Sequence, residues 1–196
     1  MRKSFYAYMA RLKLIRRWGL MRNTQEENDA EHSLQVAMIA HGIALIGKNR
    51  YGRDIDPEHA LALAVYHDAA EVLTGDMPTP VKYTSPKLRE AYGRVESEAE
   101  ETLLSMLPED MREPIGKCMT EKDTLERKVV KCADRISAYI KCLEEQRAGN
   151  REFDAASRSI SEAIREMDLP EVHDFMREMI PSFLLTLDEL NQEDNP

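Results

Sequence analysis

The sequence DPEHALALAVYHDAAEVLTGD, residues 56–76, indicates the fold class more clearly than any other part of the chain. It opens with Asp56-Pro57, a helix-start signal, because aspartate accepts hydrogen bonds from free backbone N–H groups and proline suits the first helical position. Apolar residues then recur at helical spacing from Leu61 to Val65 and lead into the doublet His67-Asp68. We expect the loop TGDMPTP, residues 74–80, to end this helix.

The rest of the chain repeats this helical spacing, and no stretch shows the strict alternation of a strand. Further helices are predicted to begin near Asn28, Pro86 and Leu125, and Gly47 and Gly149 are expected to end the first and the last of these. The predicted fold class is therefore all-α.

For the helix after Asn28, the expected core stripe consists of Leu34, Ala37, Met38, His41 and Leu45. Near the other end of the chain, Pro181 is expected to kink the last helix. The length of 196 residues suits one well-filled core, so we predict one domain over residues 1–196, with a frayed tail at about residues 191–196.

The composition excludes several classes of partner. A net charge of -9 opposes binding to a nucleic-acid polymer, which requires many Lys or Arg contacts to phosphate. No apolar run approaches the roughly 18 residues needed to span a membrane. The three cysteines, Cys118, Cys132 and Cys142, show no CxxC spacing, so we expect a reduced, cytoplasmic protein.

Ionisable residues interrupt two otherwise apolar helical stretches, and these residues are the candidates for chemistry. One is His32 in AEHSLQVAMIAHG, residues 30–42, and the other is the His67-Asp68 doublet. A buried charge is costly without a partner or a metal. Imidazole nitrogen and carboxylate oxygen together suit divalent metals such as Mn, Fe, Co, Ni or Zn. A single histidine on an apolar face is more often a hydrogen-bonded core residue, which is what we expect of His41 and His59.

Taken together, His32, the His67-Asp68 doublet and Asp134 in VVKCADRISAYIKC resemble the H…HD…D signature of the HD-domain phosphohydrolases. In that superfamily the four residues bind a divalent metal inside a helical bundle. The segments RLKLIRRWGLMRN, AEHSLQVAMIAHG and YHDAAEVLTGDMPTPVKY are similar to those of the bacterial 5′-deoxynucleotidases, and the likeness covers nearly the whole chain.

The resemblance implies a role for each matching residue. The implied metal ligands are His32, His67, Asp68 and Asp134. The implied substrate-binding residues are Arg17, Trp18, Asp68, Asp76, Met77, Pro78, Thr79 and Asp134. The implied catalytic residues are Arg17, Glu71 and Asp76, the two acids lying close to the reacting water. The resemblance also implies a homodimer and one divalent transition metal ion per chain, Co²⁺ or Mn²⁺.

These roles agree with the chemistry of phosphate esters. A metal ion neutralises the anionic phosphate and lowers the pKa of a bound water. Arg17 offers a planar fork that matches phosphate oxygens, whereas Arg16 would point elsewhere. Without the resemblance, a solvated surface charge would be the simpler interpretation of Arg17. Trp18, which follows it, is predicted to fill the space of a ribose 2′-hydroxyl, the alternative being that it anchors the first helix to the core.

The two acids have competing interpretations. Glu71 lies four residues after His67 and is expected on the same helix face if the helix continues through Ala69 and Ala70. From there it could orient a water molecule or relay a proton, or it could instead orient the imidazole of His67. Asp76 follows a glycine in a loop, where a turn-forming aspartate is the ordinary explanation.

We therefore predict a cytoplasmic enzyme that hydrolyses deoxyribonucleoside 5′-monophosphates to deoxyribonucleosides and phosphate. One alternative is another HD phosphohydrolase, acting on a cyclic nucleotide, a nucleoside triphosphate or an alarmone, which fold analogy does not separate from the first. The other is a catalytically silent nucleotide-binding or helical interaction module.

Overall fold

The computed structural model describes residues 3–82 and 84–192, and every regular element within them is a helix. Residues 193–196 of the expected frayed tail lie outside the described residues. The elements are α1 (Phe5–Met9), η1 (Leu12–Leu14), α2 (Asp29–Tyr51), α3 (Pro57–Val65), α4 (Glu71–Thr74), α5 (Thr79–Lys82), α6 (Pro86–Ser105), α7 (Glu109–Thr120), α8 (Leu125–Arg147), η2 (Arg151–Phe153), α9 (Asp154–Arg165), α10 (Pro170–Glu178), η3 (Ile180–Leu184) and α11 (Leu187–Leu190), where η marks a 3-10 helix. The predicted all-α class is confirmed.

The predicted helix starts are confirmed by their caps. The side chain of Asp56 accepts hydrogen bonds from the backbone N–H groups of Glu58 and His59 at the start of α3. Asn28 caps α2 in a capping box with Glu31. Both caps satisfy N–H groups that have no partner inside the helix. The Asn28 cap also fixes the first turn of α2, where His32 lies.

The predicted end of α2 at Gly47 is wrong, because the helix continues to Tyr51. It ends at Gly52, whose φ of 61° is the left-handed conformation that favours glycine. Gly47 instead lies where α10 approaches α2, since a Cβ there would be 3.4 Å from Oε1 of Glu171. Close packing explains this glycine.

The core face of α2 also differs from the prediction. Leu34 and Met38 are each 60% exposed and Leu45 is 37% exposed, although Ala37 is buried as expected. The buried face is instead formed by Val36, Ala37, Ile39, Ala40, Ile43 and Ala44. Because α2 carries apolar residues around most of its surface, the sequence offers two stripes, and packing against α3, α8 and α10 selects one of them.

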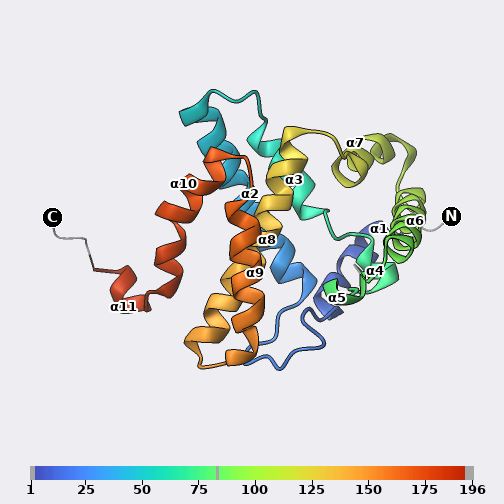
Figure 1. Ribbon diagram of the computed structural model, residues 1–196. Coiled ribbons are helices and arrows are strands. Elements are labelled where there is room, and N and C mark those ends of the chain that lie inside the picture. Colours follow the sequence, from blue (N-terminus) through green and yellow to red (C-terminus); the bar gives the residue numbers. More distant parts are fainter. Residues whose placement is uncertain (1–2, 83, 193–196) are drawn as a thin grey trace.

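The helices form two hydrophobic cores, and the His67-Asp68 turn lies between them. The larger core joins α2, α3, α8, α9 and α10, and the smaller one joins α1, α6 and α7 (Figure 1). Leu63 and Ala64 belong to the larger core, whereas Ala69 belongs to the smaller one. The chain thus crosses from one core to the other at His67 and Asp68, with packed residues on both sides.

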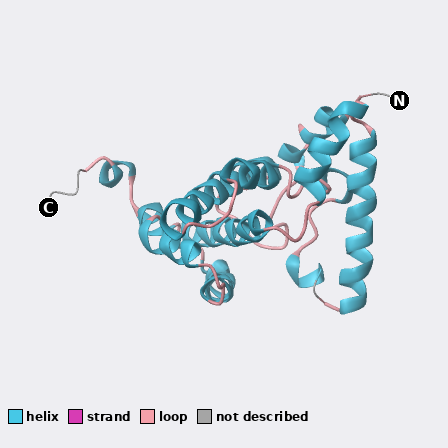
Figure 2. Ribbon diagram, turned by 90° about the horizontal axis from the view of Figure 1, so that it is seen from above, coloured by secondary structure: helices cyan, strands magenta, loops and turns pink. Residues whose placement is uncertain are grey.

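The C-terminal part departs from a simple kinked helix. α10 ends at Glu178, and Pro181 lies in the 3-10 helix η3 that follows, so the expected kink is a complete break. α11 stands apart from the main bundle in both ribbon views (Figures 1 and 2). Among the described residues, no helix combines the length and apolar character that crossing a membrane would need.

Candidate metal centre

Three elements bring the predicted metal ligands together. His32 lies in the first turn of α2, His67 and Asp68 lie in the turn after α3, and Asp134 lies in the middle of α8. α2 packs against both α3 and α8 in the larger core, so the packing of these helices fixes the relative positions of the four side chains.

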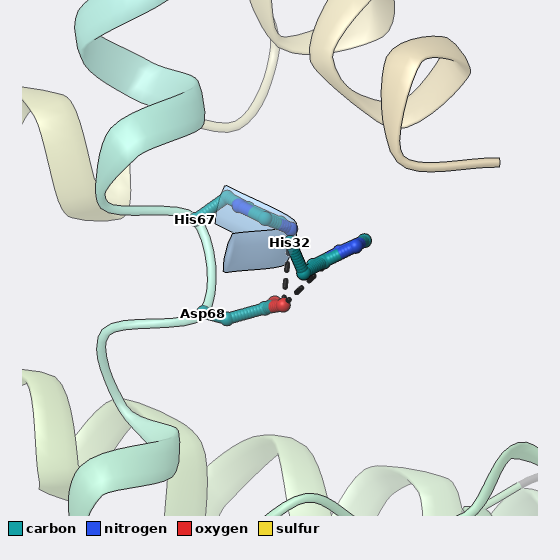
Figure 3. A group of neighbouring side chains, drawn as sticks. All are labelled: His32, His67 and Asp68. Atoms are coloured by element: carbon teal, nitrogen blue, oxygen red, sulfur yellow. Dashed lines mark ion pairs between the residues drawn. The ribbon is translucent and has the colours of Figure 1, made fainter. Parts of the chain in front are cut away.

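The carboxylate of Asp68 points toward both imidazole rings (Figure 3). Its Oδ2 lies 3.0 Å from Nε2 of His67 and 3.6 Å from Nε2 of His32. One candidate ligand atom from each of these three residues lies within 4.8 Å of the others. Oδ1 of Asp134 is 3.1 Å from Nε2 of His32. The structure therefore brings His32, His67 and Asp68 together and places Asp134 beside Nε2 of His32.

The other nitrogen of each imidazole already has a partner. Nδ1 of His67 lies 2.7 Å from the carbonyl oxygen of Ala64, to which its N–H donates. Nδ1 of His32 lies 3.2 Å from Oγ of Ser137, and that hydroxyl donates to Oε1 of Gln35 at 2.6 Å. Because the Ser137 proton is used in this way, Nδ1 of His32 must be the donor. This arrangement leaves Nε2 of each ring free to bind a metal.

Both Nε2 atoms are buried and have no hydrogen-bond partner of acceptable geometry. A buried acceptor lone pair that faces carboxylates is unfavourable unless a proton or a cation lies between them. Burial opposes the charged form of His32, but its interactions with the nearby carboxylates of Asp134 and Glu27 outweigh burial and raise its pKa to about 9. A metal ion would take the place of that proton. The donor set therefore fits a divalent cation.

The surrounding groups carry more acid than base. Burial, together with the charges of Asp68 and Asp29, raises the pKa of Glu71 to about 11. Burial likewise raises the pKa of Asp29 to about 6 and raises that of Asp76. By contrast, burial is outweighed at Asp68, where His67 holds the carboxyl pKa well below its usual range. Additional positive charge at this site would relieve the crowding of carboxylates.

Arg17 is the cationic group placed among these acids. Its Nη1 lies 3.3 Å from Oδ2 of Asp68 and 3.6 Å from Oδ1 of Asp29, and its side chain is 15% exposed. Although burial opposes its charge, Asp68 and other nearby carboxylates raise the pKa of Arg17. Arg16 is 59% exposed and pairs with Glu26, although the segment is not the helix on which its expected direction depended.

Glu71 reaches the site by a different route from the expected one. The helix does not continue past His67, because α3 ends at Val65 and a turn leads to α4, which begins at Glu71. Burial of Ala69 and Ala70 in that turn redirects the chain. The expected continuous helix face shared with His67 is therefore absent, although the charge of Asp68 still acts on the pKa of Glu71.

The remaining predicted residues lie on the connections around the site. Asp76 is close enough to Arg17, Asp68 and His32 for their charges to act on its pKa. Met77 and Pro78 are partly buried in the connection between α4 and α5. The side chain of Thr79 lies outside what the structure describes.

Trp18 occupies a loop rather than a helix. Its φ of 58° places a bulky side chain in the left-handed region, which such residues rarely adopt. The indole N–H donates to Oε2 of Glu27 at 2.7 Å, and the ring lies 5.3 Å from that of Phe153, centroid to centroid. These two contacts hold the indole in place.

The sequence analysis missed Glu27, Asp29 and Ser137. Glu27 contacts three residues of the site, since besides Trp18 its carboxylate lies 3.7 Å from Nε of Arg17 and 3.7 Å from Nδ1 of His32. Glu27 and Asp29 flank the cap residue of α2, where acids are ordinarily explained by the helix dipole. Ser137 follows Asp134 by three residues and so shares its helix face, a spacing that would have identified it.

Comparisons with known proteins agree with the resemblance seen in the sequence. A family model described as 5′-deoxynucleotidase YfbR-like matches residues 4–183. A 5′-deoxynucleotidase of Vibrio atlanticus (strain LGP32) is 47% identical over 189 residues, which cover 95% of this chain and 97% of that one. Another, from Erwinia tasmaniensis, is 47% identical over 191 residues and 96% of each chain.

Solved structures share the fold. The crystal structure of an HD-domain phosphohydrolase from Listeria innocua matches with a TM-score of 0.81 and 25% identity, covering 97% of this chain and 92% of that one. An HD phosphohydrolase of cyanophage S-2L, bound to dA and one catalytic Zn²⁺ ion, matches with a TM-score of 0.62 over 91% of this chain and 95% of that one. At 22% identity this second likeness concerns the fold alone.

Divalent metal should raise the melting temperature, because the ligands come together only in the folded chain. At a Mn²⁺ concentration 100 times its Kd, the expected stabilisation is about 2.7 kcal/mol. For a chain of this size that corresponds to a rise of roughly 5–10 °C. Thermal unfolding of chelator-treated protein with and without Mn²⁺ measures it.

Asp68→Asn should abolish this rise. His59→Asn is the matched control, because His59 pairs with Glu121 at 2.6 Å and is not a predicted ligand, so the rise should persist. A full rise in Asp68→Asn would contradict the ligand assignment.

Proposed function

Because the chain belongs to the YfbR-like 5′-deoxynucleotidase family, we propose that the residues gathered around His32, His67 and Asp68 form its catalytic centre. The chain is a metal-dependent 5′-deoxynucleotidase, a phosphoric monoester hydrolase that converts deoxyribonucleoside 5′-monophosphates to deoxyribonucleosides and phosphate. The observation that carries the proposal is the pair of buried, unpartnered Nε2 atoms facing the carboxylate of Asp68. Membership of this family disfavours a cyclic nucleotide, a nucleoside triphosphate or an alarmone as substrate, and it disfavours a catalytically silent module.

The proposed ligands of one metal ion per chain are His32, His67, Asp68 and Asp134. A divalent ion bound there would neutralise charge on the phosphate and lower the pKa of a water molecule. We favour cobalt or manganese, because a set that mixes imidazoles with carboxylates suits these ions better than magnesium, which prefers oxygen ligands and retained water. The cyanophage relative of the same fold contains zinc, which makes zinc the next candidate.

Arg17 is proposed to bind the phosphate. Its guanidinium lies 3.3 Å from Asp68, so a phosphate next to the metal ligands would be within its reach. Contacts with Asp68, Asp29 and Glu27 restrict its orientation before substrate arrives. A planar fork held in this way can donate two parallel hydrogen bonds to phosphate oxygens.

Glu71 is proposed to handle a proton, ahead of Asp76. Hydrolysis removes a proton from the attacking water and delivers one to the 5′-oxygen of the leaving nucleoside. Oε2 of Glu71 is buried without a partner, and the carboxyl interacts with Asp29, so the two acids can share a proton. Asp76 is proposed to bind substrate and assist, with Met77, Pro78 and Thr79 shaping the surrounding segment.

Trp18 is proposed to select the deoxyribose. A side chain that excludes a 2′-hydroxyl by steric contact must be rigid, because a flexible apolar pocket rejects an added hydroxyl by only about a hundredfold. The contacts of the indole with Glu27 and Phe153 provide that rigidity.

The proposed assembly is a homodimer of single HD domains, each spanning residues 1–196. Leu34, Met38 and Leu45 recur at helical spacing on the exposed face of α2, and such a stripe suits a self-complementary interface. A cytoplasmic location is proposed because all three cysteines are free thiols. The net charge of -9 opposes binding to a nucleic-acid polymer, and the proposed partner is a small nucleotide, with no membrane partner.

Arg17→Lys should lower kcat/KM for a deoxyribonucleoside monophosphate by at least about tenfold, because an ammonium group cannot reproduce a bidentate contact. Steady-state kinetics with saturating Mn²⁺ measures the effect. Arg16→Lys is the matched control, since Arg16 is exposed and pairs with Glu26, and it should keep the wild-type value. Wild-type kinetics in Arg17→Lys would show that Arg17 is not the phosphate ligand.

Trp18→Ala should lower the deoxyribo-to-ribonucleotide ratio of kcat/KM by at least about tenfold, because the proposed steric wall is removed. Matched pairs of nucleoside 5′-monophosphates with the same base measure the ratio. The melting temperature, recorded in parallel, separates selectivity from stability. An unchanged ratio with a lowered melting temperature would mean that Trp18 only anchors its loop.

A further inference from the structure

The loop that carries Arg17, Trp18 and Glu27 has neither helix nor strand between its ends. An isolated β-bridge between Arg16 and Asn28 joins the two ends of the loop, and the N–H of Arg17 donates to the carbonyl of Glu27 at 3.0 Å. The loop therefore needs other partners to fix the backbone at its far end.

Glu145, near the C-terminal end of α8, supplies those partners. Its carboxylate is 1% exposed and accepts the backbone N–H of Thr24 at 2.9 Å, the hydroxyl of Thr24 at 2.7 Å and the N–H of Gln25 at 3.2 Å. It also accepts from the side-chain amide of Asn150 at 2.8 Å and from Nζ of Lys141 at 2.5 Å. Lys141, itself 4% exposed, donates to the carbonyl of Gln25 as well.

A second set of contacts leads from this ion pair to Trp18. Nζ of Lys141 lies 5.8 Å from the ring centroid of Phe153, and Phe153 in turn packs against the indole. Asn150 also donates to the carbonyl of Arg22 at 2.7 Å, so the η2 region holds the same loop. The pair thus contacts the loop backbone directly and the Trp18 ring through Phe153.

Glu145 lies far from the reacting atoms. It follows Asp134 by eleven residues on α8, a distance of about 16 Å along the helix axis. Burying an ion pair costs desolvation energy that its attraction often fails to repay, so stability alone is a weak explanation for it. Trp18, meanwhile, holds a backbone conformation that persists only where its surroundings enforce it.

We propose that Glu145 is a positioning residue of the nucleotidase: together with Lys141 it fixes the loop that carries Arg17 and Trp18, and it thereby sets the preference for deoxyribose. The inference rests on the proposed role of Trp18 in selecting the sugar. Both carboxylate oxygens of Glu145 accept hydrogen bonds, so a neutral amide at this position would keep one acceptor and turn an NH2 donor toward other donors. The loop would then relax, and the indole would no longer be held in a fixed position.

The test compares Glu145→Gln with Glu171→Gln. Glu171 on α10 is a matched control, because it is also fully buried and lies 3.5 Å from a basic side chain, Arg53. Trp18 is the only tryptophan in the chain, so tryptophan emission and its quenching by acrylamide report on the loop without any substrate. The sugar ratio of kcat/KM, measured with saturating Mn²⁺, and the melting temperature complete the set.

Glu145→Gln should shift the emission to longer wavelength, increase quenching and lower the deoxyribo-to-ribonucleotide ratio by at least about fivefold. The rise in melting temperature with Mn²⁺ should persist, because the metal ligands lie outside the loop. Glu171→Gln should lower the melting temperature and leave both the emission and the ratio at wild-type values.

A lowered melting temperature in Glu145→Gln, with wild-type emission and ratio, would overturn the proposal and make the ion pair a stabilising contact only. Altered emission with an unchanged ratio would overturn it too, because the loop would then not set the sugar preference. If Trp18→Ala itself leaves the ratio unchanged, the proposed role of Trp18 fails instead. Thr24→Val keeps the ion pair and removes only the hydroxyl contact, so it should give smaller changes in the same direction even if Glu145→Gln does not fold.

Discussion

Carboxyl groups outnumber cationic groups where the chain crosses between its two hydrophobic cores. Asp29, Asp68, Glu71 and Asp134 surround two imidazoles, and Arg17 supplies the fixed positive charge. Burial limits the screening of these charges by water, so their mutual repulsion raises the pKa of Asp29 and of Glu71 and favours the protonated form of Glu71. A divalent cation bound at the two Nε2 atoms would reduce the excess of negative charge, and it would also allow an anionic phosphate to approach.

The proposed metal site and the proposed substrate contacts lie on different kinds of segment. The proposed metal ligands lie on α2, on α8 and in the turn after α3, which is packed on both sides. The proposed substrate contacts lie on irregular segments, the loop of residues 17–27 and the connection before α5. Because the proposed ligands lie on packed elements and the proposed substrate contacts lie on separately anchored loops, changes in the loops can alter the sugar preference while the metal site stays intact.

The sequence predicted that His32, His67 and Asp68 act together, and the structure brings candidate ligand atoms of all three within 4.8 Å of one another, while their role as metal ligands stays a prediction. It also predicted the helix starts, since the caps at Asp56 and Asn28 depend on local hydrogen bonds. It failed for the core face of α2, where tertiary packing chooses between two apolar stripes. Glu27 and the left-handed backbone of Trp18 were missed because both depend on a loop closed by contacts distant in sequence.

The central claim is that one metal ion completes the acidic site through His32, His67, Asp68 and Asp134. A crystal structure of the Mn²⁺-loaded protein, with anomalous data collected at the metal edge, tests it most directly. The account predicts one anomalous peak per chain, bonded to Nε2 of both histidines at about 2.1 Å and to both aspartates, with Nδ1 of His67 still donating to the carbonyl of Ala64. An ion bound through Nδ1 of either histidine, or located away from these four residues, would contradict it.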